Sequence, residues 1–161
     1  DRQTLLAGAL CHDLGKLREL SSGLLQDYTT SGRLIGHITL GLELLAPFLR
    51  AGGLESHLVE HLKHLVLSHH GCLEFGSPCL PATAEALALH FADNLDAKMN
   101  QVAGALEALP EGGEGWSGFE PGLDRRLYRP LPTPGKEPAG AARAGLGPER
   151  QDRQCSLLLK E

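Results

Sequence analysis

The sequence predicts an all-α fold, and three observations support this. Apolar residues recur at intervals of three and four through most of residues 3–109, which is the spacing of one face of a helix. No segment alternates apolar and polar residues as a half-buried strand does. Glycine and proline stand between the periodic segments, where they separate helices. With 161 residues, 42% of them hydrophobic, the chain can bury the core of one ordinary domain.

The first periodic segment covers residues 3–11 and predicts a helix. It runs into the sequence HDLGK, where Gly15 indicates a turn. Residues 16–20 predict a further short turn of helix. Residues 21–32 are rich in Ser, Gly and Thr, which is typical of a loop.

The next two helices are expected at residues 34–45 and 54–70. We expect the first to stop near Pro47, because proline lacks the backbone N–H that a helix interior needs. The second carries the clearest apolar stripe of the chain, and Gly71 follows it where a left-handed C-terminal cap favours glycine.

The last predicted helix is long and covers residues 84–109, with Thr83 as its N-cap. After Pro110 the composition changes, but apolar and aromatic residues between 116 and 128 are expected to dock on a core. Residues 130–161 are dominated by Pro, Gly, Ala and Arg, which predicts a flexible tail. The expected organisation is therefore one domain over residues 1–129 and a tail over residues 130–161.

Charge is unevenly distributed along the chain. Residues 1–123 hold 7 basic and 15 acidic side chains, a net charge of −8, whereas residues 124–161 hold 8 and 5, a net charge of +3. An acidic body alone is a poor candidate for tight binding of nucleic acid through phosphate neutralisation, but it fits carboxylates gathered around bound cations. No apolar run approaches a membrane span, and the N-terminus lacks the layout of a signal peptide. We expect a cytoplasmic protein, without membrane partners, whose four cysteines are reduced.

Histidines and aspartates that could bind metal lie on, or at the end of, separate predicted helices. Packed helices can direct such side chains into a common interior. Imidazoles and carboxylates without thiolates suit Mn²⁺ best, with Fe or Zn²⁺ as alternatives, and six groups are more than one tetrahedral ion requires. The sequence therefore predicts two divalent ions, with candidate ligands His12, Asp13, His37, His69, His70 and Asp93.

The remaining histidines are assigned other roles. His57, His61 and His64 share one helix face beside the apolar stripe, and we assign them to a solvated surface. His61→Ala is accordingly expected to be nearly silent. His90 lies one turn before Asp93, which indicates a structural or supporting role.

The sequences HDLGK, GHI, SHHG and ADNLDAKMN together resemble the HD-domain metal-dependent phosphohydrolase superfamily. More narrowly, residues 4–129 resemble the HD domain of YhaM-type 3′–5′ exoribonucleases. The resemblance implies an HD-domain helical bundle with two metal ions. It places one metal on His12, Asp13 and Asp93, with Asp13 bridging to a second held by His37, His69 and His70. It also implies catalytic roles for Asp13 and for Lys16, which would neutralise charge developing on the phosphoryl oxygens.

The chain departs from that pattern at its beginning. The superfamily's first histidine lies on a helix upstream of the HD pair, whereas no histidine precedes His12 and the chain begins with Asp1. We therefore expect a piece of a longer enzyme whose first metal shell is one ligand short. YhaM-type enzymes also carry an upstream OB-fold domain, which the resemblance implies as the part that grips single-stranded nucleic acid.

The function expected from the resemblance is metal-dependent hydrolysis of single-stranded RNA, and of DNA as a further substrate, from the 3′ end to 5′-mononucleotides. A phosphohydrolase acting on nucleotides or cyclic dinucleotides is one alternative. A fragment that binds metal without turnover is the other.

Overall fold

The computed structural model describes residues 1–22 and 27–132. The chain divides into two compact units, Asp1–Asn94 and Leu95–Glu161. The predicted tail covers residues 130–161, and its part from residue 133 onward lies outside the described residues. The domain limits drawn from the sequence stay a prediction.

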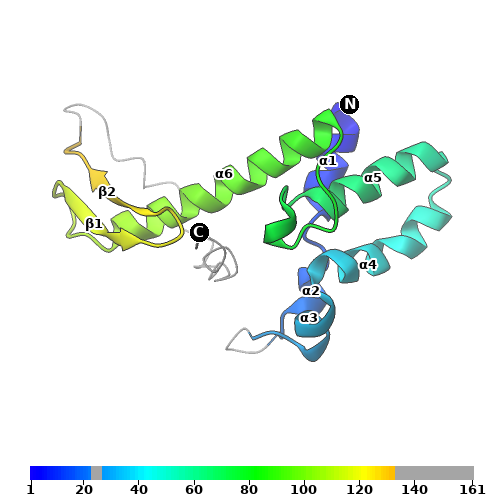
Figure 1. The fold of residues 1–161 in the computed structure, drawn as a ribbon, viewed down its shortest axis with the longest axis horizontal. Coiled ribbons are helices and arrows are strands. Elements are labelled where there is room, and N and C mark those ends of the chain that lie inside the picture. The colour runs from blue at the N-terminus through cyan, green and yellow to red at the C-terminus, as the bar shows by residue number, and fades with distance from the viewer. Residues whose placement is uncertain (23–26, 133–161) are drawn as a thin grey trace. The chain divides into compact units, whose positions relative to one another are not determined.

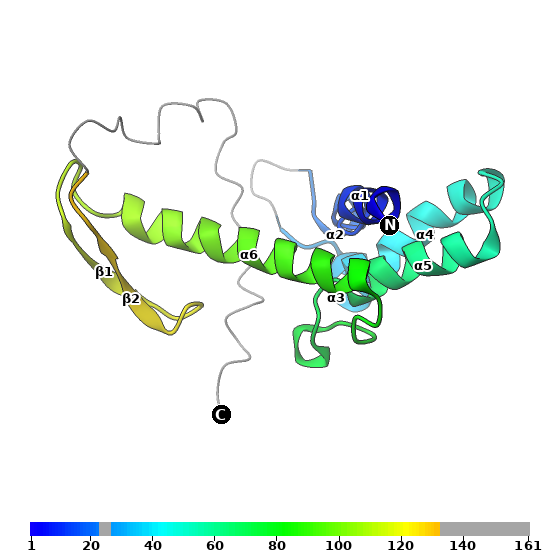
Figure 2. The same cartoon turned by 90° about the horizontal axis from the view of Figure 1, so that it is seen from above.

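The first unit is built from helices, in agreement with the predicted fold class (Figure 1). The helices α2, α3 and α4 pack on one another, α4 packs on α5, and α1 packs on α5, a contact that Figure 2 shows from above. Their bounds are α1 Arg2–Cys11, α2 Lys16–Glu19, α3 Thr30–Ile35, α4 His37–Ala51, α5 Ser56–Ser68, a 3₁₀ turn Leu73–Phe75, and α6 Ala84–Glu107, which begins in this unit. Thr83 caps α6 as predicted, because its Oγ1 accepts the Ala86 N–H at 3.2 Å.

The core of the first unit lies between α5 and the first turns of α6. Leu65 and Ala86 are fully buried and Leu89 is 3% exposed, and Leu5 of α1 packs against this cluster. Gly8 allows the close approach of α1, since a Cβ at that position would lie 2.3 Å from a methyl carbon of Leu65. The apolar stripe predicted for α5 thus forms the centre of the fold.

The helix predicted at residues 34–45 is in fact two helices. Gly36 separates α3 from α4 with φ +79° and ψ 154°, a conformation that side chains rarely adopt. His37 therefore becomes the first residue of α4. The prediction that the helix stops near Pro47 is also wrong, because α4 tolerates Pro47 and continues to Ala51. A missing backbone N–H removes only one hydrogen bond, and the buried apolar face of α4 offsets that loss.

The turn after α1 lies directly on the start of α4. A Cβ at Gly15 would lie 1.8 Å from the carbonyl oxygen of His37 and 2.6 Å from the backbone nitrogen of Gly41. Only glycine permits this approach, which brings His12 and Asp13 close to His37.

The second unit contains the end of α6 and an antiparallel hairpin of β1 (Gly115–Glu120) and β2 (Arg125–Arg129). The sequence analysis misses this hairpin, because its strands are short and glycines interrupt the alternation. Trp116 and Phe119 are 64% and 56% exposed, so the expectation that they dock on a core is wrong. The Lys98 Nζ donates to the Gly122 carbonyl at 2.6 Å and ties the hairpin turn to α6. No helix in the described part of the chain combines the length and apolarity that a membrane crossing requires.

Candidate metal centre

The six candidate ligands meet in the first unit and form two groups. His12, Asp13 and Asp93 form the first group, and His37, His69 and His70 form the second. Within each group the potential ligand atoms lie within 4.8 Å of one another. The groups draw on the ends of α1 and α5, the start of α4 and the middle of α6, so helix packing assembles residues that are far apart in sequence.

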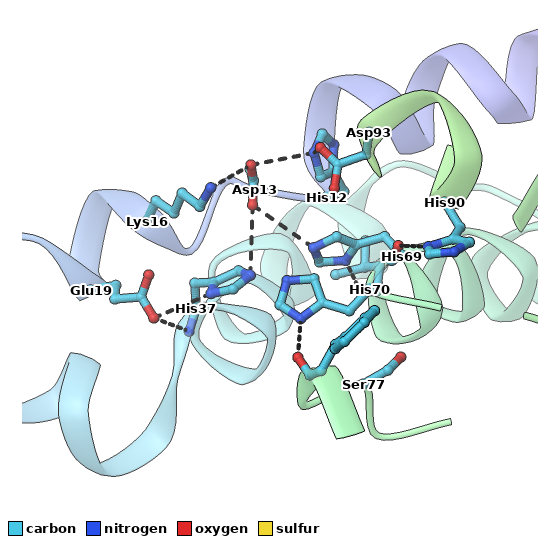
Figure 3. A network of polar contacts seen from close by, with 12 residues as sticks. His12, Asp13, Lys16, Glu19, His37, His69, His70, Ser77, His90 and Asp93 are labelled. Atoms are coloured by element: carbon cyan, nitrogen blue, oxygen red, sulfur yellow. Dashed lines mark hydrogen bonds and ion pairs between the residues drawn. The ribbon is translucent and has the colours of Figure 1, made fainter. Parts of the chain in front are cut away.

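Asp13 lies between the two groups, and each of its carboxylate oxygens faces one of them (Figure 3). Its Oδ2 is 3.3 Å from His12 Nε2. Its Oδ1 is 3.6 Å from His37 Nε2 and 3.8 Å from His69 Nε2. Asp93 completes the first group, with its Oδ1 3.6 Å from His12 Nε2. Among the described residues, Asp13 is therefore the one carboxylate that lies within 4 Å of imidazoles of both groups.

Lys16 lies at the edge of this centre. It is the last residue of HDLGK and the first residue of α2, and its Nζ is 2.8 Å from Asp13 Oδ2. Its side chain is 39% exposed, so the ammonium group is accessible from solvent. The catalytic roles of Lys16 and Asp13 stay predictions.

Each of the four imidazoles is held at Nδ1, which leaves Nε2 facing the centre. The Nδ1–H of His12 donates to the Ala9 carbonyl at 2.9 Å, that of His69 to Val66 at 2.7 Å, and that of His70 to Phe75 at 2.7 Å. The Nδ1–H of His37 instead donates to Glu19 Oε1 at 3.2 Å. This pattern of a fixed Nδ1–H and an inward Nε2 is typical of metal-binding histidines.

Two of these inward nitrogens have no hydrogen-bond partner within the described residues. His37 Nε2 and His69 Nε2 are buried and make no hydrogen bond there. A buried polar atom without a partner costs free energy, and a metal ion would accept both lone pairs. The residues present thus fit a divalent metal in the second group, and the carboxylates and imidazole of the first group fit another.

In the first group, the pKa of each side chain is shifted in the direction that favours its charged form. Burial lowers the pKa of His12, but hydrogen bonds and charges from Asp13 and Asp93 outweigh burial and raise it to about 10. Burial raises the pKa of Asp13, but hydrogen bonds from His12 and Lys16 hold it well below its usual range. The pKa of Asp93 is likewise lowered, since its interaction with His12 outweighs burial. Without metal, His12 is an imidazolium ion between two carboxylates.

In the second group, the pKa values of two imidazoles are shifted in the direction that favours the neutral form. Burial and the neighbouring His70 lower the pKa of His69 to about 3. Burial also lowers the pKa of His70, against its hydrogen bond to the Phe75 carbonyl. These two imidazoles are neutral at pH 7 and hold Nε2 lone pairs ready for a cation.

His90 and Gly71 hold the turn that carries His69 and His70. The His90 Nδ1–H donates to the His69 carbonyl at 3.0 Å, which confirms the predicted supporting role of His90. A Cβ at Gly71 would lie 2.2 Å from the His90 ring, and Gly71 also adopts φ +79°. Glycine is required there for both reasons.

The assignment of three other histidines to a solvated surface is correct for only one of them. His57 is exposed, and its Nδ1 lies 3.3 Å from Glu55 Oε2. His61 Nε2 is 3.1 Å from Thr83 Oγ1, and His64 Nε2 accepts the Ala82 N–H at 2.9 Å. These two histidines connect α5 to the segment before α6, a contact between distant segments that helical spacing does not reveal.

The residue that the sequence analysis misses is Glu19. It is 2% exposed, and its Oε1 accepts both the backbone N–H and the Nδ1–H of His37. The available signal was a lone carboxylate between apolar Leu17 and Leu20 on a one-turn helix.

Residues 1–98 match the family model of the HD domain, and the chain belongs to this family. Among curated proteins it resembles the 3′-5′ exoribonuclease YhaM of Bacillus pumilus (strain SAFR-032), with 47% identity over 112 residues. The proteins of the same name from Bacillus subtilis (strain 168) and Shouchella clausii (strain KSM-K16) are 46% and 44% identical over 112 residues. Each match covers 70% of this chain but only 35–36% of the relative, so the chain spans about a third of their length. No solved structure matches.

Proposed function

We propose that this chain is the catalytic HD domain of a metal-dependent phosphodiesterase. The substrate is single-stranded RNA, with DNA as a further substrate, degraded from the 3′ end to 5′-mononucleotides. The observation that carries the proposal is Asp13, whose two oxygens face two separate groups of candidate ligands. The similarity to proteins named 3′-5′ exoribonuclease supports this choice of substrate.

In this proposal the centre holds two divalent cations, with Mn²⁺ preferred. His12, Asp13 and Asp93 would hold one, and His37, His69 and His70 would hold the other, with Asp13 shared. Bound there, the cations would supply Lewis acidity toward the phosphate and a water of lowered pKa. The Nδ1 contacts of the chain keep the four Nε2 atoms oriented, and the buried second group excludes water from one side of the centre.

Lys16 is proposed to stabilise the negative charge that develops on the phosphoryl oxygens. Its ammonium group lies beside Asp13 and is partly exposed. A fixed positive charge at the edge of a partly buried site favours a transition state that is more negative than the substrate. Lys16 also lowers the pKa of Asp13 and so keeps that carboxylate ionised.

We propose that the nucleic acid is gripped mainly by an OB-fold domain outside this chain. Residues 1–123 carry 7 basic and 15 acidic side chains, which disfavours phosphate binding by this region alone. We also propose that the domain extends to residue 129. Arg129 supports this, since its guanidinium donates to the Leu106 carbonyl at 3.1 Å near the end of α6, a helix that begins in the first unit.

The test loads the chain with Mn²⁺ and supplies a 5′-labelled oligoribonucleotide and, separately, nucleotides and cyclic dinucleotides. Stepwise shortening of the oligonucleotide from its 3′ end supports the proposal. Hydrolysis of the small molecules alone would favour a nucleotide phosphohydrolase. Bound metal without hydrolysis of any substrate would identify a metal-binding fragment. Asp93→Asn should reduce activity, whereas Asp96→Asn, at an exposed carboxylate on the same helix, is the matched control.

A further inference from the structure

His37 differs from the other three imidazoles of the centre in what holds its Nδ1. Backbone carbonyls accept from His12, His69 and His70, but a carboxylate oxygen, Glu19 Oε1, accepts from His37. Figure 3 shows Glu19 behind His37, on the side away from Asp13. A carbonyl would be sufficient to orient the ring, so the carboxylate calls for a further explanation.

Glu19 occupies an unfavourable position for a carboxylate. Its side chain is 3% exposed, and Oε2 is buried without a hydrogen-bond partner among the described residues. Burying a charged group with one oxygen unsatisfied costs free energy. In the metal-free protein, the carboxylate therefore costs stability that a neutral acceptor would not.

The composition of the second ligand group explains what the protein gains from a buried carboxylate at Glu19. His37, His69 and His70 are all imidazoles, which carry no negative charge of their own. Besides Glu19, the carboxylate within 4 Å of these rings in the described part of the chain is Asp13, which is also shared with the first group. A divalent cation held by neutral imidazoles gains from a negative charge placed behind one of the rings.

We propose that Glu19 is a positioning residue for the second cation, an inference that rests on the proposed metal centre. Its Oε1 fixes the Nδ1–H tautomer of His37, which leaves the Nε2 lone pair inward. Its charge, transmitted through the ring, makes His37 a stronger ligand and offsets part of the charge of the cation. The free energy lost by burying Glu19 in the metal-free protein is recovered when the cation binds.

Glu19 also has a structural role, which the test must distinguish from its proposed effect on the second cation. The same Oε1 accepts the His37 backbone N–H at 3.0 Å, one of the free donors at the start of α4, where Gly36 provides no side-chain cap. Glu19→Ala removes this cap, the ring contact and the charge together. Glu19→Gln keeps an acceptor oxygen for both donors, removes the charge and places an amide NH2 group at the buried position of Oε2.

The experiment compares the wild-type chain with Glu19→Gln and with Glu43→Gln. Glu43 lies on the same helix as His37, but it is 54% exposed and 3.7 Å from Arg18, so it is the matched control. Binding of Co²⁺ is followed by its visible absorption, and the stability of the metal-free chain is followed by thermal unfolding. The His37 tautomer is read from the ¹⁵N shifts of the ring in the metal-free protein.

We expect the wild-type and Glu43→Gln chains to bind two Co²⁺ ions. Glu19→Gln should bind one of them about 10–100-fold more weakly, with a changed absorption spectrum. Its metal-free form should keep the His37 tautomer. Glu19→Ala should lose the tautomer and unfold at a lower temperature.

Equal Co²⁺ affinity and spectrum for Glu19→Gln and the wild type would overturn the role of Glu19 and leave the metal centre standing. Weaker binding accompanied by loss of the His37 tautomer in metal-free Glu19→Gln would also overturn it, since that pattern indicates that the charge has no separate effect on the cation. Absence of Co²⁺ binding by the wild type would instead overturn the metal centre itself, and the role of Glu19 with it.

Discussion

The two ligand groups of the centre contain the same kind of side chain in opposite electrostatic environments. The side chain of His12 is 15% exposed and faces Asp13 and Asp93, which are 33% and 37% exposed, whereas that of His69 is 1% exposed and lies among imidazoles. The pKa of His12 is raised to about 10 and that of His69 is lowered to about 3. At His12 the interactions with Asp13 and Asp93 together outweigh desolvation, whereas at His69 desolvation outweighs the more distant Asp13.

This difference predicts two routes to metal binding. In the first group the raised pKa of His12 favours a proton on its Nε2, and a divalent cation would displace this proton. In the second group the lowered pKa values of His69 and His70 favour the neutral form, and a cation would satisfy buried nitrogens that lack hydrogen-bond partners. Asp13 belongs to both environments, so changing it affects the whole centre.

The largest effect is expected for Asp13→Ala. This change removes the carboxylate that both groups share, and hydrolysis should fall by more than about 10³-fold. Turnover of the labelled oligonucleotide and the metal content of the purified chain measure the effect. Retained activity at normal metal content would show that the two groups do not depend on Asp13.

The second group should make the metal-free protein sensitive to acid. His69 has a folded pKa of about 3 against 6.5 in the unfolded chain, so the unfolded state binds more protons between these values. Stability should therefore fall as pH decreases from 6.5 toward 3, by about 2–4 kcal/mol. Urea unfolding at pH 7 and pH 4.5 measures this loss. His69→Gln should flatten the profile, and an unchanged slope would contradict a neutral buried His69.

The first group should release a proton when it binds metal. The His12 pKa of about 10 keeps the ring protonated at pH 7, and Nε2 must lose this proton to bind a cation. Affinity for one of the two ions should thus rise up to about tenfold per pH unit below pH 10. Calorimetric titration in buffers of different ionisation enthalpy counts the protons. A count of zero would mean that the two groups bind metal in the same way.

The smallest effect is expected for histidines outside both groups. His61→Ala should lower the free energy of unfolding by about 1 kcal/mol, because it removes the contact with Thr83, the cap of α6. This differs from the silent change expected from the sequence. Metal binding should be unchanged, and exposed His57 is the matched control. Loss of a bound ion in His61→Ala would show that the centre extends beyond the two groups.

Much of the helical fold could be predicted from sequence because its signals are local. The apolar stripe of α5 and the Thr83 cap of α6 depend on residues within one or two turns. The hairpin was missed because Trp116 and Tyr128 pair across twelve residues in strands of five and six residues. The break at Gly36 was missed because the apolar spacing continues through it.

The sequence by itself determined which chemistry is available: imidazoles and carboxylates at helix ends, with the HDLGK and SHHG patterns that indicate an HD domain. It could not determine the protonation of these groups, since a pKa depends on neighbours that are remote in the chain. Only the tertiary structure placed a different oxygen of Asp13 toward each group and buried Glu19 behind His37. The physical reason is that charge and desolvation act through space, so the imidazolium form is favoured at position 12 and the neutral imidazole at position 69.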